Sequence, residues 1–316
     1  MAMPLVETKN LKKYFKTGAG MLHAVEDVNL KIMPGKTLGV VGESGCGKST
    51  LGRTILRLQP ATAGEVLYNG ENILKYKGKD MQKIHLNMQM VFQDPYSSLD
   101  PRMSVHNLIA EPVQVCGLLK TKAEINEHVR EIMDMCGLPA DQANLFPHEL
   151  DGGLRQRVGL ARAMAVSPKF IVCDEPVSAL DVSIRAQILN LLMDLQEQRE
   201  LSYMFITHDL CVVKHISDEI MVMYMGQVVE HAKTAELFAN PVHPYTKALL
   251  HAVPTIDLSK RNREGFMLRG EVTSPINPAP GCRFAPRCPY ATDKCKENVC
   301  LKEVSPDHFV ACSLCD

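Results

Sequence analysis

Short apolar runs alternate with helical spacings along most of the chain. Val25–Ile32, Thr37–Val41 and Glu65–Tyr68 are short apolar or alternating segments bounded by Pro, Gly and Asn, and they predict strands. Phe170–Cys173 and Tyr203–Ile206 are almost wholly apolar, which is typical of strands buried on both faces of a parallel sheet. These runs predict a protein of the α/β class.

Helical spacing fills the stretches between these runs. Ser183–Glu200 lies between the last two strands and predicts a βαβ unit of a doubly wound sheet. Ser49–Leu58 predicts a helix directly after a Gly-rich loop. The region from about residue 97 to 165 contains the helical segments Ala123–Cys136 and Leu154–Val166, so a mostly helical subdomain is expected there.

The pattern becomes irregular from Pro241 onwards. Five prolines lie between Pro275 and Pro289, and six of the 11 cysteines lie between Cys282 and Cys315. We therefore expect a main domain over residues 1–240 and a loop-rich, Cys-containing C-terminal extension over 241–316.

Composition narrows the class of protein further. The chain of 316 residues is 46% hydrophobic and 22% charged, which is ordinary for a globular protein. The formal net charge is −1 and the pI is about 6.8, so the basic excess of a nucleic-acid-binding surface is missing and no nucleic-acid partner is expected. No apolar run approaches the roughly 18 to 20 residues of a membrane span, and the first residues lack the apolar stretch of a secretory signal. We expect a protein of the cytosol.

The octapeptide Gly42–Ser49 has the P-loop spacing G-x-x-x-x-G-K-[ST]. It follows a predicted strand and opens a predicted helix, where backbone amides and the helix N-terminus can bind phosphates. Lys48 is expected to reach the β- and γ-phosphates and Ser49 to bind Mg²⁺; the alternative is a Gly-rich turn without a ligand. The residues expected around the nucleotide are Gly42, Ser44, Gly45, Cys46, Gly47, Lys48, Ser49 and Thr50.

A pair of carboxylates follows the apolar strand Phe170–Cys173. Asp174 stands at the strand end, where it can complete a Mg²⁺ shell beside a phosphate loop. Glu175, the next residue, is the candidate base that polarises the attacking water. The alternative is that both are surface acids at a strand end.

With these motifs the sequence resembles the ATP-binding cassette (ABC) family over essentially its whole length, which implies a P-loop core with a mixed sheet. Met90–Pro95 resembles the family's Q-loop, whose Gln93 would touch Mg²⁺ or water. Ile206–Asp209 resembles the switch region, whose His208 would contact the γ-phosphate. Phe15, or Tyr14 as the alternative, lies where the family stacks an aromatic ring on adenine. The D-loop is matched by Ser178, Ala179, Leu180 and Asp181.

Three further segments resemble the ATPases of dipeptide and oligopeptide importers, with nickel importers as a related alternative. They are Val91–Arg102, Asn240–Thr246 and Gly281–Pro289. The resemblance implies ATP and Mg²⁺ as ligands and a place on the cytoplasmic face of the membrane. The implied partners are a second homologous ATPase, two membrane-spanning permeases and an extracellular solute-binding protein. Rival readings are a non-transport cassette protein, or a regulator that binds ATP without hydrolysing it.

The family signature Leu-Ser-Gly-Gly-Gln is altered in this chain: its five positions are Leu150, Asp151, Gly152, Gly153 and Leu154. In the family this segment acts on the ATP bound by the partner cassette. A carboxylate about 4 Å from that phosphate would be repelled by on the order of 4 kcal/mol at an effective dielectric near 20, and Asp151 can also cap its own helix. We therefore expect asymmetry: the site built on Lys48 and Glu175 hydrolyses ATP and the opposite one does not. The alternative is a tolerated substitution.

Four cysteines in the extension are candidate ligands of a metal or cluster. In a reducing compartment structural disulfides are disfavoured, and the spacing lacks the close pairs of most zinc sites. A [4Fe-4S] cluster suits four thiolates, and the resemblance to peptide importers supports it. Zinc and unmetallated thiols remain open, as does substitution by Cys300 or Cys315. The expected ligands are Cys282, Cys288, Cys295 and Cys312.

Overall fold

The computed structural model describes residues 3–94, 98–253, 274–297 and 299–315. The chain divides into two compact units, each described here by itself. Unit 1 comprises residues 1–75 and 205–316, and unit 2 comprises residues 76–204. Pro95, Tyr96 and Ser97, which belong to one of the importer-like segments, lie outside the described residues.

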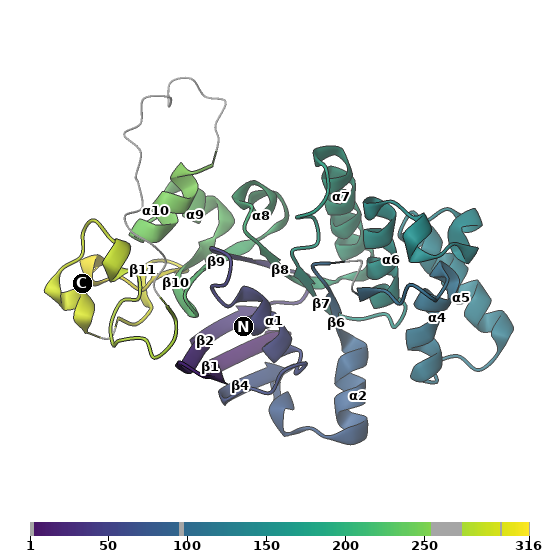
Figure 1. Cartoon of the computed structure of the whole chain (residues 1–316), viewed down its shortest axis with the longest axis horizontal. Helices are drawn as coiled ribbons and strands as arrows, with labels where there is room; N and C mark the ends of the chain where they lie inside the picture. The colour runs from purple at the N-terminus through teal and green to yellow at the C-terminus, as the bar shows by residue number, and fades with distance from the viewer. Residues whose placement is uncertain (1–2, 95–97, 254–273, 298, 316) are drawn as a thin grey trace. The chain divides into compact units, whose positions relative to one another are not determined.

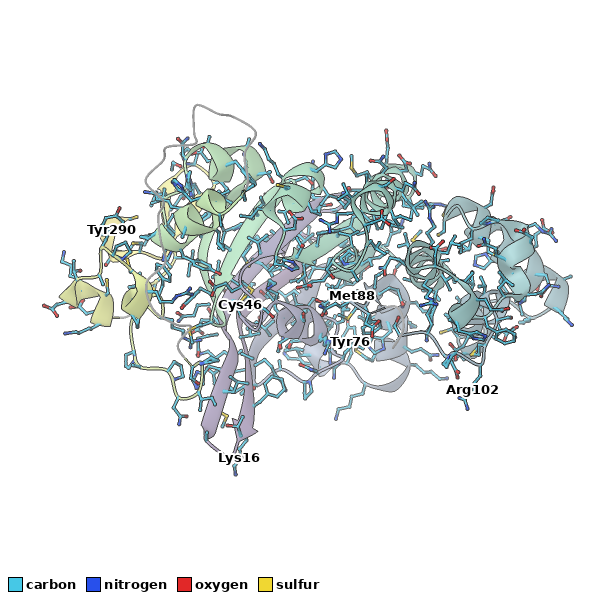
Figure 2. The ribbon with its side chains drawn as sticks, turned by 45° about the horizontal axis from the view of Figure 1, so that its top comes forward. Lys16, Cys46, Tyr76, Met88, Arg102 and Tyr290 are labelled. Atoms are coloured by element: carbon cyan, nitrogen blue, oxygen red, sulfur yellow. The ribbon has the colours of Figure 1, made fainter. Side chains whose placement is uncertain are left out.

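The first sheet of unit 1 is antiparallel and has the strand order β2-β1-β4-β5. Its strands are β1 (Val6–Thr17), β2 (Gly20–Ile32), β4 (Ala63–Tyr68) and β5 (Glu71–Asn72). The β1–β2 hairpin carries Lys16 near its tip (Figure 2). In β2 the apolar residues Val28, Leu30 and Ile32 alternate with polar ones and are buried, which is why this segment folds as a strand with one covered face.

The second sheet of unit 1 is mixed. Strand β3 (Thr37–Val41) pairs in parallel with β9 (Glu219–Tyr224), and β9 pairs antiparallel with β10 (Gln227–Lys233). The C-terminal extension continues this sheet, because β12 (His308–Val310) pairs with β10 and β11 (Lys302–Ser305) pairs with β12. All five residues of β3 are buried, as its apolar sequence predicts.

The extension is attached to β10 by a buried hydrogen bond between His308 and Glu230. Glu230 is fully buried, and its carboxylate accepts hydrogen bonds from His308 Nε2 at 2.7 Å and from the backbone amides of Val242 and His243 at 2.8 and 2.9 Å. A buried carboxylate is tolerated only when its oxygens are hydrogen-bonded in this way. The helices of unit 1 are α1 (Lys48–Ile55), α8 (Leu210–Ile216), α9 (Thr234–Ala239) and α10 (Pro244–His251).

Unit 2 is mainly helical around two parallel strands, β6 (Met88–Val91) and β7 (Phe170–Asp174) (Figure 1). Strand β8 (Ser202–Thr207) crosses the division between the units. The helix Val182–Arg199 buries Ile188, Leu192 and Leu195 on one face at helical spacing. The helices that lie wholly within the described residues are α2 (Gly78–Asn87), α4 (Val105–Val115), α5 (Lys122–Met135), α6 (Gly152–Met164) and α7 (Val182–Arg199).

The structure confirms the α/β class and the strands and helices expected from the sequence, except that the strand expected from Val25 begins at Gly20. Further elements were not expected: the strands β1, β5, β6 and β9 to β12, and the helices α2, α8, α9 and α10. The extension is less irregular than its prolines suggested, because Pro244 occupies the first turn of α10, where a missing N–H costs nothing. The domain boundaries at 240/241 and about 97–165 stay predictions. Among the described helices none is long and apolar enough to span a membrane.

Candidate functional site

The phosphate loop Gly42–Ser49 links β3 to α1 within unit 1. Gly42 has a φ of 153°, and a Cβ there would lie 2.2 Å from the carbonyl oxygen of Met223. Gly47 has a φ of 103°, and a Cβ there would lie 2.0 Å from the carbonyl oxygen of Ala24. Only glycine fits at these two positions, because neighbouring backbone carbonyls occupy the space that a Cβ would need. A Cβ on Gly45 would meet no atom within 4 Å, so the other side of the loop is open.

Lys48 is held on the inside of this loop. Its ammonium donates to the carbonyls of Gly42 at 2.8 Å and Glu43 at 2.9 Å, and the residue is 5% exposed. The N-cap residue of α1 is Gly47, which offers no side-chain cap to the first amides of the helix. A helix N-terminus whose N-cap residue has no side chain, a glycine backbone and a buried ammonium form an arrangement that fits nucleotide phosphates.

The aromatic residues near the start of the chain differ in their surroundings. Tyr14 stacks on His23 with ring centroids 4.0 Å apart, and its hydroxyl donates to Glu26 at 2.5 Å. Burial and this hydrogen bond raise the pKa of Tyr14 to about 12. Phe15 is half-buried, with the Lys13 ammonium 4.6 Å from its ring centroid. Both rings therefore have a partner within the protein, and the choice of Phe15 over Tyr14 as the adenine-stacking residue stays a prediction.

His208 lies in unit 1 directly after β8 and is exposed. Its neighbour Asp209 is the N-cap of α8, with Oδ1 accepting from Cys211 N at 2.9 Å, and its amide donates to Thr207 Oγ1 at 3.1 Å. The backbone after His208 is thus fixed by these hydrogen bonds, and the role of His208 toward the γ-phosphate stays a prediction.

In unit 2 the structure brings Gln93 and Glu175 together. Gln93 Nε2 donates to Glu175 Oε2 at 3.1 Å, which ties the Q-loop residue to the candidate base. Glu175 has a φ of 46°, a left-handed conformation that costs free energy for a residue other than glycine. Asp174, the residue before it, is fully buried at the end of β7. The two adjacent carboxylates therefore differ in burial: Asp174 is fully buried and Glu175 is half-buried.

Unit 2 also brings the signature segment and the D-loop together. A Cβ on Gly153 would lie 2.6 Å from Ile184 Cγ2, and one on Gly152 would lie 3.4 Å from Leu180 Cδ2. Asp151 caps α6 by accepting from Leu154 N at 2.8 Å. Asp181 caps α7 in the same manner, accepting from Ile184 N at 3.0 Å. The two loops therefore open two helices whose first turns pack closely.

The residues expected to bind Mg²⁺ fit that ion by their chemistry. Ser49, Gln93 and Asp174 offer hydroxyl, amide and carboxylate oxygens, the hard ligands that Mg²⁺ prefers. The full burial of Asp174 gives one of these oxygens a dry setting, where a cation is bound more strongly than in water. Their roles as ligands stay predictions.

The four cysteines expected to bind a cluster are less clearly arranged for it. Burial raises the pKa of Cys282 to about 11 and also raises that of Cys288 and Cys312. Against the effect of burial, hydrogen bonds from Ser313 and Thr292 lower the pKa of Cys295. In the part of the chain that the structure describes, no group of three or more Cys, His, Asp or Glu residues could hold a metal ion. The expectation of an iron–sulfur cluster is not confirmed.

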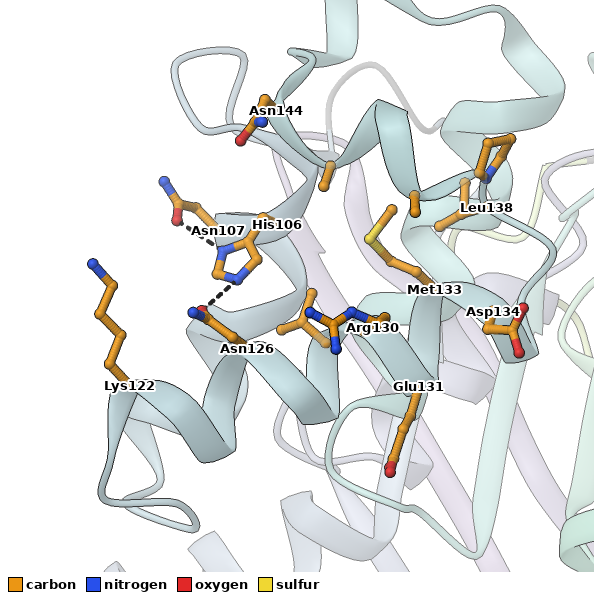
Figure 3. A pocket seen from close by; sticks show the side chains of 14 residues that line it. His106, Asn107, Lys122, Asn126, Arg130, Glu131, Met133, Asp134, Leu138 and Asn144 are labelled. Carbon is orange, nitrogen blue, oxygen red and sulfur yellow. Dashed lines mark hydrogen bonds between the residues drawn. The ribbon is translucent and has the colours of Figure 1, made fainter.

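A surface pocket of about 950 Å³ lies in the helical part of unit 2 (Figure 3). It is lined by residues of α4, α5 and the turn that follows, and His106 bridges two of these elements by bonding Asn126 at 3.0 Å. None of the residues expected to bind nucleotide lines it.

Glu43 was not singled out from the sequence although it lies inside the phosphate loop. Its amide donates to Tyr245 Oη at 2.9 Å, and its carboxylate binds Arg287 Nη1 at 2.8 Å. An acid within a motif that binds polyanions was the signal in the sequence. The partners lie more than 200 residues away, so spacing alone could not identify them.

The fold and the loop define a P-loop nucleotide-binding protein. Residues 25–178 match the family described as ABC transporter, and residues 229–295 match the C-terminal region of oligopeptide/dipeptide transporters. The oligopeptide transport ATP-binding protein AppF of Bacillus subtilis is 47% identical over 98% of this chain and 97% of its own length. OppF of the same organism is 48% identical over 99% of this chain and 97% of its own length. This chain therefore belongs to the ABC transporter family and is an ATPase.

Solved structures agree with this assignment. The ATP-binding cassette MJ0796, in a dimeric post-hydrolysis state bound to ADP and Pi, superposes with a TM-score of 0.67 and is 30% identical. The match covers 72% of this chain and 98% of that one. The cassette cbiO1 of Clostridium perfringens gives the same TM-score at 26% identity, covering 75% of this chain and 92% of its own.

The contact between Gln93 and Glu175 predicts the effect of one isosteric change. Replacing Glu175 with Gln keeps the shape and removes the base, so we expect ATP turnover to fall by about 10² to 10⁴ while ATP still binds. Turnover of the assembled complex and binding of a fluorescent ATP analogue measure the two effects. Glu197→Gln, on the exposed face of α7, is the control. Unchanged turnover in the Glu175 variant would contradict the assignment of the base.

Proposed function

We propose that this chain is the ATP-hydrolysing subunit of an importer of dipeptides or oligopeptides. The observation that carries the proposal is the match of residues 229–295 to the C-terminal region of oligopeptide/dipeptide transporters, on a chain that aligns with peptide transport proteins over nearly its whole length. The relatives are named for oligopeptides, which favours a peptide over a nickel complex as the solute.

The partners that this function requires are a second ABC ATPase, two permeases and an extracellular solute-binding protein. The chain would act as a peripheral subunit on the cytoplasmic face of the membrane. Two ATP molecules would lie between the paired cassettes, so that closure and hydrolysis shift the permeases between access states.

The roles of the residues follow from their chemistry. Lys48 and the loop amides would hold the phosphates, and Ser49, Gln93 and Asp174 would hold Mg²⁺, which neutralises phosphate charge when bound. Glu175 would take a proton from the attacking water while Gln93 orients its carboxylate. His208 would contact the γ-phosphate.

Uptake in cells tests this function directly. Cells that carry Lys48→Ala in this chain should lose ATP-dependent uptake of a labelled peptide, because the variant lacks the ammonium inside the phosphate loop. The tagged wild-type chain should copurify with multi-spanning subunits from solubilised membranes. Unchanged peptide uptake in the variant, together with a tagged chain that elutes alone, would refute the proposal.

The helix cap made by Asp151 supports a second proposal, that the two ATP sites of the assembly differ. Its carboxylate accepts the Leu154 amide at 2.8 Å, so a fixed negative charge occupies the N-terminus of α6. That position would otherwise favour an anion such as the partner's γ-phosphate. The site built on this chain's Lys48 and Glu175 would hydrolyse ATP, and the opposite site would bind it without turnover.

Restoring the family signature tests the asymmetry. The double change Asp151→Ser with Leu154→Gln removes the charge, so turnover per complex should rise toward twofold as the second site becomes active. The Glu175→Gln change should abolish hydrolysis, and the equivalent change in the partner should leave most of it. If the partner's change abolishes hydrolysis as fully as Glu175→Gln does, and the double change leaves the rate unaltered, the two sites are equivalent.

An iron–sulfur cluster on the four cysteines of the extension stays a hypothesis. The Cys295 thiol accepts a hydrogen bond from the backbone amide of Thr292 at 3.5 Å, a feature that suits a bound thiolate. The hypothesis expects anaerobically purified protein to contain iron and labile sulfide and to absorb near 400 nm. Bound zinc without iron would favour a zinc site on these cysteines. Protein that contains no metal would contradict both the iron–sulfur cluster and the zinc site.

A further inference from the structure

The cysteine segment of the extension reaches the phosphate loop through Arg287. This arginine ends the short 3₁₀ turn Ala285–Arg287, and its Nη1 donates to both carboxylate oxygens of Glu43, at 3.1 and 2.8 Å. The Arg287 side chain is 8% exposed and that of Glu43 is 26% exposed. Because the arginine is buried, this ion pair is screened less than a surface pair.

All three polar groups of Glu43 are engaged. Its amide donates to Tyr245 Oη at 2.9 Å, its carbonyl accepts from Lys48 Nζ at 2.9 Å, and its carboxylate binds Arg287. Tyr245 and Phe284, both from the C-terminal part of unit 1, pack against Tyr224 as an aromatic cluster beneath this point. Glu43 is therefore held by residues of the C-terminal part of the chain and at the same time contacts Lys48, the expected phosphate-binding lysine.

A second arginine supports the loop from behind. Arg283 pairs with Glu26 at 3.0 Å and donates to the Met225 carbonyl. The next residue, Gly226, donates its amide to the Cys46 carbonyl inside the phosphate loop at 2.8 Å. Arg283 and Arg287 thus approach the same loop by two routes, and each is directly bonded in sequence to a cysteine of the extension.

Because Glu43 is negatively charged, its contact with Arg287 affects the binding of ATP as well as the packing of the extension. An unpaired carboxylate in this loop would repel the ATP phosphates, and in a partly buried setting the repulsion persists over several ångströms. A guanidinium with two hydrogen bonds to the carboxylate cancels that charge and fixes its direction. A neutral residue at position 43 would need no such partner.

We propose that Arg287 is a positioning residue of the nucleotide site, which acts through Glu43 to hold and neutralise the phosphate loop, so that the C-terminal extension sets the affinity for ATP. The proposal rests on the ATPase activity of the family and is independent of which solute is transported. Arg283 has the supporting role of holding the turn behind the loop.

Nucleotide binding by the full-length chain tests the proposal. Arg287→Met should raise the Kd for a fluorescent Mg-ATP analogue by on the order of tenfold, because it leaves the Glu43 charge uncompensated. In the assembled complex the KM for ATP should rise similarly while kcat changes little. Adding Glu43→Gln to Arg287→Met should restore the Kd to within about twofold of wild type, since the unpaired charge is then gone.

The rescue separates this proposal from a purely structural role of Arg287. If the arginine only supports folding of the extension, the added Glu43→Gln change would not restore affinity. If Arg287→Met does not fold, the comparison uses Arg287→Lys and Arg287→Gln instead. The Lys variant should bind ATP more tightly than the Gln variant, because it keeps the positive charge beside Glu43. Lys296→Ala, which removes an exposed ion pair with Asp293 from the same segment, is the matched control. Unchanged affinity in Arg287→Met, or a failed rescue, overturns the proposal.

Discussion

The structure depends on how closely backbone approaches the phosphate loop from behind. The Met223 and Ala24 carbonyls stand where a Cβ of Gly42 or Gly47 would lie, so the loop can curve only with glycine at these points. That curvature carries Lys48 inside and leaves the Gly45 side open. Because Met223 belongs to β9 and Ala24 to β2, both sheets of unit 1 must be in place before the loop has its shape.

The extension joins this arrangement as part of the unit and not as an appended tail. It contributes β12 to the mixed sheet and buries His308 against Glu230. It also pairs Arg287 with Glu43 in the loop and Arg283 with Glu26 in β2. Burying charge costs free energy unless each group is paired and hydrogen-bonded. The pairs in this protein connect residues that are far apart in sequence, so their cost is offset only when the extension and the loop are both ordered. Order in one segment therefore stabilises order in the other.

Much of this could be predicted from the sequence, and the failures have physical reasons. The strand Thr37–Val41 and the helix over Val182–Arg199 were predicted within about one residue, because local hydrophobic periodicity determines them. The residues of the phosphate loop were predicted because phosphate binding demands a fixed local spacing, whereas Gln93, His208 and the D-loop were predicted from resemblance to the family. Helix α10 was missed because the whole segment after Pro241 was expected to be irregular, although Pro244 suits the first turn of a helix. Glu43, Tyr245 and Arg287 were missed as a group because no local pattern encodes contacts across 200 residues.

In unit 2, aspartates cap the N-termini of two neighbouring helices, α6 and α7. Asp151 and Asp181 each cap a helix, and the glycines after Asp151 let the two first turns approach within side-chain contact. Serine at position 151 could also cap α6, but without placing a full negative charge there. The aspartate therefore gains a stronger cap at the expense of an anion site at the same helix end. Under the proposed difference between the two ATP sites, the aspartate at position 151 would act through what that end of α6 can bind.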